Sequence, residues 1–244
     1  MLIIQKPIQP EWHTLLTDSL QEGIVISLNK PYGWTSADVV RKVKFMVQRR
    51  WKIKNIKVGH AGTLDPLATG ILLVCIGKAT KAVESLQAQE KEYIASIRFG
   101  ATTPCFDLEK EVDQTYPHEH ITQEAIKEAL HTMTGPQEQM PPQFSAKMVD
   151  GKRAYERARS GIETSLTPSL IEIFEANLLQ CNLPDITVQI RCSKGTYIRA
   201  FARDLGNALQ SGAHLTGLVR SQNGPFTLDR AIDLEDFAKI CTEN

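Results

Sequence analysis

Hydrophobic and polar side chains alternate most regularly over residues 186–192, where apolar residues from Ile186 to Cys192 occupy every second position. A period of two is typical of a strand with one buried and one polar face. Residues 91–99 follow the same period, with an apolar face made of Tyr93, Ala95, Ile97 and Phe99. The alternation therefore predicts two half-buried strands.

Two shorter stretches, 24–28 and 71–76, are apolar without alternation. Both are far too short to cross a membrane, so we predict two fully buried strands. The turn residues from Asn29 to Gly33 should end the first of them. A last strand is expected around 215–220, followed by a hairpin at Asn223-Gly224-Pro225.

Helical spacing of apolar residues begins after Thr35 or Ser36, either of which can cap a helix. Its apolar positions are Val39, Val40, Val43 and Val47. The other predicted helices cover 11–20, 78–88 and 122–133, and one starts near Thr196 with Ile198, Phe201, Leu205 and Leu209 on its apolar side.

Strands and helices alternate irregularly, and no internal repeat is evident. We therefore predict an α+β fold, with a mixed, mostly antiparallel central sheet flanked by helices and loops. Residues 1–22 are expected to form an N-terminal extension, and residues 23–244 one domain. Length and composition agree with this, because 244 residues of which 42% are hydrophobic can bury a sizeable core.

Composition narrows the class of protein. The N-terminus lacks the basic and long apolar regions of a signal peptide, and no stretch reaches the length of a membrane span, so we expect a cytoplasmic protein without a membrane partner. The five cysteines are odd in number, widely spaced and not grouped with histidines. They support neither a disulfide framework nor a metal site.

Charge is balanced overall, with 28 basic and 28 acidic residues, but it is unevenly distributed. Residues 41–57 contain eight basic residues and no acidic one, among them Arg49, Arg50 and Lys52. This segment either binds phosphates or is a solvated helix face. Similarly, residues 135–161, which include Lys152 and Arg153, form either an arm that touches RNA or an ordinary surface loop.

The glycine-rich stretch Val58 to Gly70 contains a single carboxylate, Asp65, directly before a proline. Glycines permit tight backbone turns and Pro66 fixes φ, so we expect a loop that holds its shape beside the strand 71–76. An aspartate on such a loop is placed like a functional group. The alternative is an Asp-Pro turn whose side chain is hydrogen-bonded locally.

Several motifs, in order along the chain, together resemble the TruB family of bacterial tRNA pseudouridine synthases. The motifs are N-K-P-Y-G-W-T-S at 29–36, G-H-A-G-T-L-D-P-L-A-T-G at 59–70, K-E-Y-I-A at 91–95, P-P-Q-F-S-A at 141–146, G-K-R-A-Y-E at 151–156, C-S-K-G-T-Y-I-R at 192–199 and H-L-T-G-L-V-R at 214–220. The resemblance covers residues 23 to about 236. It implies the pseudouridine synthase fold, a catalytic domain over 23–244, and isomerisation of the T-loop uridine at tRNA position 55.

The resemblance also implies roles for individual residues. Asp65 is the catalytic carboxylate, which attacks or stabilises C1′ of the sugar or takes a proton from it; these possibilities stay open. Arg199 is the active-site arginine, which can pair with a carboxylate while it remains charged. The other expected substrate-binding residues are a stacking Tyr93, a second pocket tyrosine Tyr197, a pocket-wall Leu218, Lys30, and His60, which fills the gap left by the flipped base. Tyr93 as a core residue and His60 as a turn residue are the alternatives.

No cofactor and no metal is expected, since pseudouridine formation involves no net redox change. The expected partner is the T-arm of tRNA, and the protein is expected to be a monomer. The sequence departs from the family in two places. Lys147 stands one position before the usual lysine, so no role is assigned to it, and the chain ends at Asn244, where we expect no C-terminal PUA domain.

Three functions compete at this point. An enzyme acting on tRNA uridine is favoured because Asp65, Tyr93 and Arg199 are all present. A non-catalytic tRNA-binding or tRNA-folding protein on the same scaffold would not need all three. A sugar hydrolase is weak, because the motif holds no second carboxylate.

Overall fold

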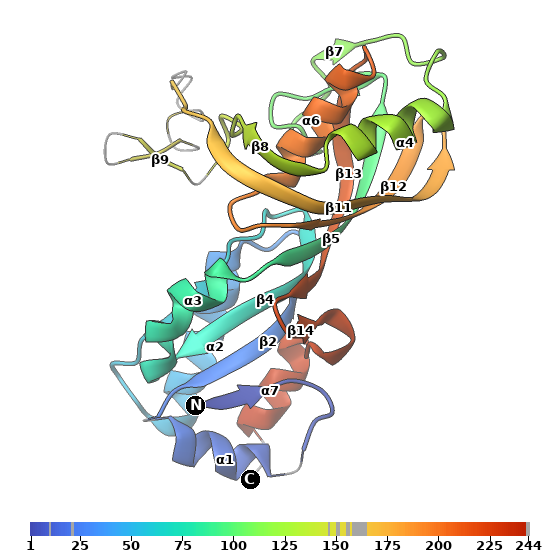
Figure 1. Cartoon of the computed structure of the whole chain (residues 1–244). Helices are drawn as coiled ribbons and strands as arrows, with labels where there is room; N and C mark the ends of the chain where they lie inside the picture. The colour runs from blue at the N-terminus through green and yellow to red at the C-terminus, as the bar shows by residue number, and fades with distance from the viewer. Residues whose placement is uncertain are drawn as a thin grey trace. The chain divides into compact units, whose positions relative to one another are not determined.

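The structure is a computed structural model that describes residues 1–9, 11–20, 22–145, 147–149, 152–154, 157 and 165–242. The chain forms two compact units (Figure 1). The first comprises Met1–Lys91 and Val219–Asn244, and the second comprises Glu92–Leu218. The polypeptide therefore leaves the first unit once and returns to it once.

The first unit contains a mixed sheet with the strand order β1-β2-β4-β13, in which β3 also pairs with β4 and β14 with β13. Strand β1 is parallel to β2, whereas β2, β3 and β4 pair antiparallel. The strands are β1 (Leu2–Ile4), β2 (Ile24–Lys30), β3 (Val58–Ala61), β4 (Ala68–Ile76), β13 (Ala213–Asn223) and β14 (Phe226–Thr227). Strand β13 belongs to this unit from Val219 onward, and its first part belongs to the second unit. The helical elements are α1 (Trp12–Ser19), α2 (Ser36–Trp51), η1 (Gly77–Ala82), α3 (Val83–Ala88), η2 (Leu228–Arg230) and α7 (Leu234–Thr242).

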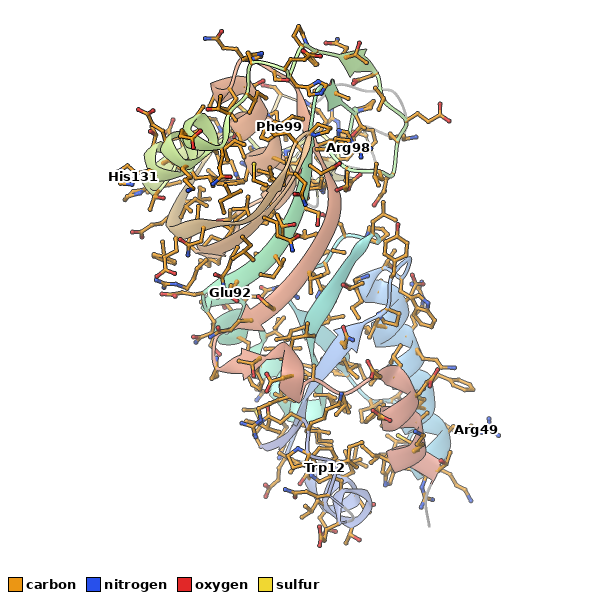
Figure 2. The ribbon with its side chains drawn as sticks, turned by 90° about the vertical axis from the view of Figure 1, so that its right-hand side faces the viewer. Trp12, Arg49, Glu92, Arg98, Phe99 and His131 are labelled. Atoms are coloured by element: carbon orange, nitrogen blue, oxygen red, sulfur yellow. The ribbon has the colours of Figure 1, made fainter. Side chains whose placement is uncertain are left out.

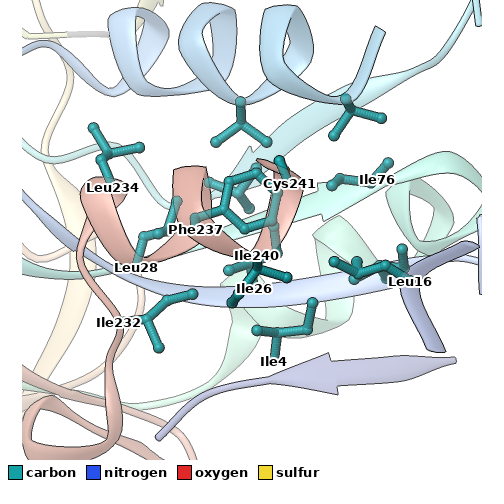
Figure 3. Close-up of a cluster of buried hydrophobic side chains, with 14 of the residues drawn as sticks. Ile4, Leu16, Ile26, Leu28, Ile76, Ile232, Leu234, Phe237, Ile240 and Cys241 are labelled. Atoms are coloured by element: carbon teal, nitrogen blue, oxygen red, sulfur yellow. The ribbon is translucent and has the colours of Figure 1, made fainter. Parts of the chain in front are cut away.

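Both faces of the β2–β4 pair are buried, which explains why these strands are apolar without alternation. Ile26 and Leu28 belong to one hydrophobic cluster, whereas Val25, one position before Ile26, belongs to another on the opposite face. On the first face, side chains of α7, including Phe237 and Ile240, pack toward β2 (Figure 3). This doubly covered pair is the rigid support of the stretch between β3 and β4.

The second unit has the strand order β13-β5-β12-β11-β8. Helix α4 packs against β11 and against α6 (Figure 1). The elements are β5 (Lys91–Phe99), β6 (Ala101–Thr102), β7 (Gln114–Thr115), α4 (Gln123–Thr132), β8 (Gly135–Gln139), β9 (Met148–Val149), β10 (Lys152–Arg153), β11 (Ser169–Asn182), β12 (Asp185–Cys192) and α6 (Ile198–Ala208). Strand β11 pairs antiparallel with both β8 and β12.

Most of the predicted elements are confirmed. Strand β5 covers 91–99 as expected, and its apolar face is buried. Thr35 caps α2, and its side chain and that of Asp38 complete a capping box. Helices α1, α4 and α6, the buried strands and the hairpin at 223–225 are also confirmed.

Four predictions were wrong in part. Strand β2 does not stop before Asn29 but continues to Lys30, because both residues keep their ladder partners on β4. The stretch 58–70 is not loop throughout, since β3 and the start of β4 pair within it. The first half of the helix expected over 78–88 is a 3-10 helix, which covers Gly77–Ala82. The last strand is longer than the predicted 215–220, because β13 covers Ala213–Asn223.

The N-terminal segment contributes to the core of the first unit. Ile4, Trp12 and Leu16 are buried in the same cluster as α7. The boundary between an extension and a domain at residue 23 stays a prediction. No helix in the described part of the chain is long and apolar enough to cross a membrane.

Candidate active site

The loop that carries Asp65 connects β3 to β4 in the first unit. Gly62 and Gly70, which flank it, have φ values of +100° and +98°, a region that glycine adopts at little cost. A Cβ on Gly70 would lie only 2.3 Å from the carbonyl oxygen of Arg220. The loop itself is turned back at Asp65, whose carbonyl accepts the backbone N–H of Ala68 at 3.1 Å. Glycine is therefore required where β4 meets β13.

Two buried side chains hold the backbone on either side of Asp65. The hydroxyl of Ser36, at the start of α2, donates to the Leu64 carbonyl at 3.1 Å and accepts the Leu64 N–H at 2.9 Å. The guanidinium of Arg220 donates to the carbonyl oxygens of Ile71 at 2.7 Å and Gly62 at 3.0 Å. The backbone on both sides of Asp65 is thus bound to side chains from two other elements.

Lys30, at the end of β2, holds the other side of the loop. Its ammonium group donates to the carbonyl oxygens of Pro66 at 3.1 Å, Pro31 at 2.9 Å and Trp34 at 2.6 Å. Burial lowers the pKa of Lys30 from 10.5 to about 8, although the negative charge of Asp65 acts in the opposite direction. Lys30 therefore lies within the electrostatic field of the predicted catalytic carboxylate. A contact of Lys30 with substrate stays a prediction.

The lowered pKa of Lys30 predicts a pH dependence of stability. Between about pH 8 and 9 the unfolded chain keeps the proton of Lys30, whereas the folded chain releases it. The contribution of Lys30 to the free energy of unfolding should therefore increase with pH in this range. Above that range the unfolded thiols of Cys75 and Cys241 ionise while burial keeps the folded thiols neutral, which acts in the opposite direction. Chemical denaturation of wild type and Lys30→Met across this window should give a smaller slope for the variant. Equal slopes would contradict the assigned shift.

His60 and Asp65 are both partly buried in the first unit. His60 lies on β3 opposite Val74 of β4, so it belongs to a strand and not to the loop tip. The prediction that His60 fills the space of a flipped base stays a prediction, as does the catalytic role of Asp65.

In the second unit, α6 positions Arg199 in its first turn. The guanidinium donates to the carbonyl oxygens of Cys105 at 3.1 Å and Phe144 at 2.9 Å, and its Nε lies 3.7 Å from a carboxylate oxygen of Asp107. Arg199 and Asp107 are both only 5% exposed. A buried arginine is thus held between two loops of its own unit. Its predicted pairing with Asp65, a residue of the first unit, stays a prediction.

The tyrosines and Leu218 also belong to the second unit. Tyr197 caps α6, and its backbone N–H and carbonyl bind the side chain of Gln139 at 2.8 and 3.1 Å. Tyr93 lies on the buried face of β5, and Leu218 lies on β13 and is partly buried. This burial agrees with both interpretations of Tyr93, as a pocket residue and as a core residue.

The predicted RNA-backbone contacts are distributed over both units. Arg49 is exposed and projects from α2 (Figure 2), Arg50 is partly buried, and Lys52 ends the helix with a φ of +54°. Lys152 and Arg153 form β10, but their side chains lie outside the described residues, as does much of the expected arm over 135–161. Phosphate binding by any of these residues stays a prediction.

Lys147, to which the sequence assigned no role, binds within its own unit. Its ammonium group donates to the Thr167 carbonyl at 2.5 Å and to the Ser169 hydroxyl at 3.1 Å. Lys147 therefore connects its own segment, which follows Pro142, to the start of β11 through hydrogen bonds. This contact gives the shifted lysine a structural role.

Sequence reasoning missed four residues that bind the surroundings of the predicted site residues, each within its own unit. Ser36, Asp107, Gln139 and Arg220 are polar, and all are buried. Three of them stand inside or next to quoted motifs, but their apolar surroundings are set by tertiary packing. Asp107 had no signal of its own, because it belongs to an acidic segment that is typical of a solvent-exposed loop.

Comparison with known proteins identifies the family of the chain. The family described as TruB family pseudouridylate synthase (N terminal domain) matches residues 49–198. A tRNA pseudouridine synthase B of Bacteroides fragilis is 56% identical, over 91% of this chain and 95% of that protein. One of Flavobacterium johnsoniae is 46% identical, over 88% of this chain and 95% of that protein.

A solved structure, a Cbf5-Nop10-Gar1 complex, contains a chain that is 27% identical and superimposes with a TM-score of 0.68 over 98% of this chain. This chain spans 62% of the length of that one. The predicted fold class, an α+β pseudouridine synthase fold with a mixed sheet, is confirmed. The chain belongs to the TruB family of pseudouridylate synthases.

Proposed function

We propose that this protein converts uridine to pseudouridine in the T-loop of tRNA, at position 55. The observation that carries the proposal is the loop of Asp65, whose backbone is bound by Ser36, Lys30 and Arg220. Membership of the family and the two relatives named tRNA pseudouridine synthase B support the same reaction.

The reaction is an isomerisation that balances within the substrate. The C1′–N1 bond breaks, the uracil turns, and a C1′–C5 bond forms, while C5 loses a proton and N1 gains one. Asp65 acts on the sugar as nucleophile, as a negative charge beside an electron-poor C1′, or as a base. Each role needs a carboxylate whose position does not change as the base turns, and the bound loop supplies it.

The uridine must leave its stack to reach Asp65, which costs a few kcal/mol. Aromatic stacking returns about 1–3 kcal/mol per base. We assign this stacking to Tyr93, supported by Tyr197, with Leu218 as an apolar wall. His60 takes the space that the base vacates, and Arg199 supplies the fixed positive charge.

Pseudouridine mapping tests the function directly. Purified protein should form pseudouridine at position 55 of an unmodified tRNA transcript, and cells that lack the gene should lose it there. If the protein is folded and binds the transcript but leaves it unmodified, the proposed enzymatic activity is rejected. This result would favour a protein that only binds or folds tRNA.

Salt dependence of RNA binding tests the basic segment. Replacing Arg49, Arg50 and Lys52 together by glutamine should weaken binding and reduce the log–log salt slope by about 0.7–0.9 for each phosphate that the variant no longer binds. Lys127→Gln, an exposed change on α4, serves as the control and should leave the slope unchanged. A triple variant with the wild-type slope would show that these residues bind no phosphate and that this face of α2 is only solvated.

A further inference from the structure

The turn between β2 and α2 carries two exposed aromatic side chains. Tyr32 is 64% exposed and Trp34 is 36% exposed, and one glycine separates them. Single exposed apolar residues are common on proteins, but neighbouring aromatic rings in solvent indicate a surface that a partner covers. Phe45 on α2 is also exposed, at 57%, but no second aromatic residue stands beside it in the sequence.

This turn is fastened to the loop of Asp65. The backbone N–H of Gly33 donates to the Pro66 carbonyl at 2.9 Å, and Lys30 donates to both the Pro66 and the Trp34 carbonyls. Gly33 has a φ of +79°, and a Cβ there would meet nothing within 4 Å. The backbone of the turn is therefore fixed on the side of Pro66 and open to solvent at Gly33.

Position and charge together indicate what covers the two rings. Pro66 directly follows Asp65, so the turn lies next to the residue that acts on the target nucleotide. Helix α2 begins directly after the turn and exposes Lys42 and Lys44, while Arg41 pairs with Asp38. A strand of RNA offers both the flat rings and the negative charges that such a surface can bind.

We propose that Tyr32 and Trp34 form an accessory site that stacks unpaired nucleobases of the substrate RNA next to the flipped uridine. The proposal rests on the proposed function. Because stacking accepts any base, the site contributes affinity and not sequence selectivity. It holds the neighbouring nucleotides while the target base is out of the stack, at a fixed position relative to Asp65.

Binding of a T-arm stem-loop RNA to substituted protein tests the site. The double variant Tyr32→Ala, Trp34→Ala should raise Kd by about five- to 150-fold, the equivalent of one lost base stack. Phenylalanine at both positions should keep Kd close to wild type, because the rings remain. Phe45→Ala is the matched control for loss of an exposed aromatic residue, and it should not change Kd.

Tryptophan fluorescence gives a second readout that a structural role would not move. Of the three tryptophans, Trp12 is 4% exposed and Trp51 donates to the Thr17 hydroxyl at 2.8 Å. Addition of the stem-loop RNA should quench part of the emission, and Trp34→Phe should reduce that quench. Thermal unfolding midpoints should match wild type for the phenylalanine variants, which keep the rings, and for Phe45→Ala, whose side chain is 57% exposed. Because Trp34 is only 36% exposed, Kd of the double alanine variant is measured well below its own unfolding midpoint.

An unchanged Kd for the double alanine variant, or a quench that is as large in Trp34→Phe as in wild type, would overturn the accessory site. An equal loss of affinity in Phe45→Ala would also overturn it, by showing that any exposed ring serves. Failure of the proposed function is separate: it appears as a wild-type protein that forms no pseudouridine on the same RNA. An active wild type with an unaffected double variant rejects this inference alone.

Discussion

Asp65→Asn should abolish pseudouridine formation while the protein still folds and binds tRNA. Asparagine keeps the size of the side chain but has no negative charge and almost no nucleophilic or basic strength. Folding should survive, because the loop is bound through backbone groups and through side chains other than that of Asp65. Affinity should survive because phosphate contacts and base stacking supply most of it.

Single-turnover kinetics with saturating enzyme measure this effect, since they separate lost chemistry from lost binding. The product should be undetectable, and the Kd for tRNA should stay near wild type. Deamidation back to aspartate is excluded by mass spectrometry of the variant. Substantial turnover by Asp65→Asn would mean that another residue performs the chemistry. Lost binding with intact stability would instead make Asp65 a structural residue of the recognition loop.

The fold was predictable where one physical signal decides the local structure. Strand β5 alternates regularly because one face is buried, and α2 begins at Thr35 because its side chain caps the helix. Strand β11 gave no such signal. Its register shifts twice along β12, and Leu170 and Leu179 are exposed, so its apolar residues do not follow a period of two.

Strand β3 and helix α7 were missed for different reasons. Strand β3 has four residues, including a glycine and a histidine, so its pairing with β4 is a tertiary effect. In α7, by contrast, Leu234, Phe237, Ile240 and Cys241 have helical spacing and are buried. The signal for α7 was present in the sequence and was not used.

The site shows the same division between local signals and tertiary packing. The sequence pointed to Asp65 through glycine and proline chemistry that acts within a few residues. It did not point to Arg220, whose partners Gly62 and Ile71 are about 150 residues away along the chain. When Arg220 is buried, its guanidinium holds backbone carbonyls in place instead of lying in solvent. Whether an arginine is buried depends on the whole fold and cannot be predicted from its neighbours in the sequence.

Asp107 is a second residue whose contacts only the folded chain reveals. Its carboxylate is the acidic partner of Arg199 that the structure records within the second unit, at 3.7 Å. Burial raises the pKa of Cys105, and a hydrogen bond with Asp107 raises it further, so the thiol beside the pair stays neutral.

Asp107→Asn should reduce kcat by about 100-fold with little change in KM, because a small displacement of Arg199 is enough to misalign a reacting group. The free energy of unfolding should fall by about 1–3 kcal/mol. A larger loss is not expected, since Arg199 keeps its bonds to the carbonyls of Cys105 and Phe144. Steady-state kinetics on a tRNA transcript and chemical denaturation measure the two effects.

Two further variants test whether the expected loss of kcat in Asp107→Asn is due to the lost negative charge. Asp107→Glu retains a carboxylate and should recover part of kcat, although its extra methylene must fit a buried site. Glu111→Gln removes an exposed carboxylate from the same segment and should leave kcat and stability unchanged. Asp107→Asn should stay folded, because Arg199 keeps its two bonds to carbonyl oxygens. A wild-type kcat in this variant would therefore show that the arginine needs no acidic partner in its own unit. In that case its position is set by the carbonyls alone.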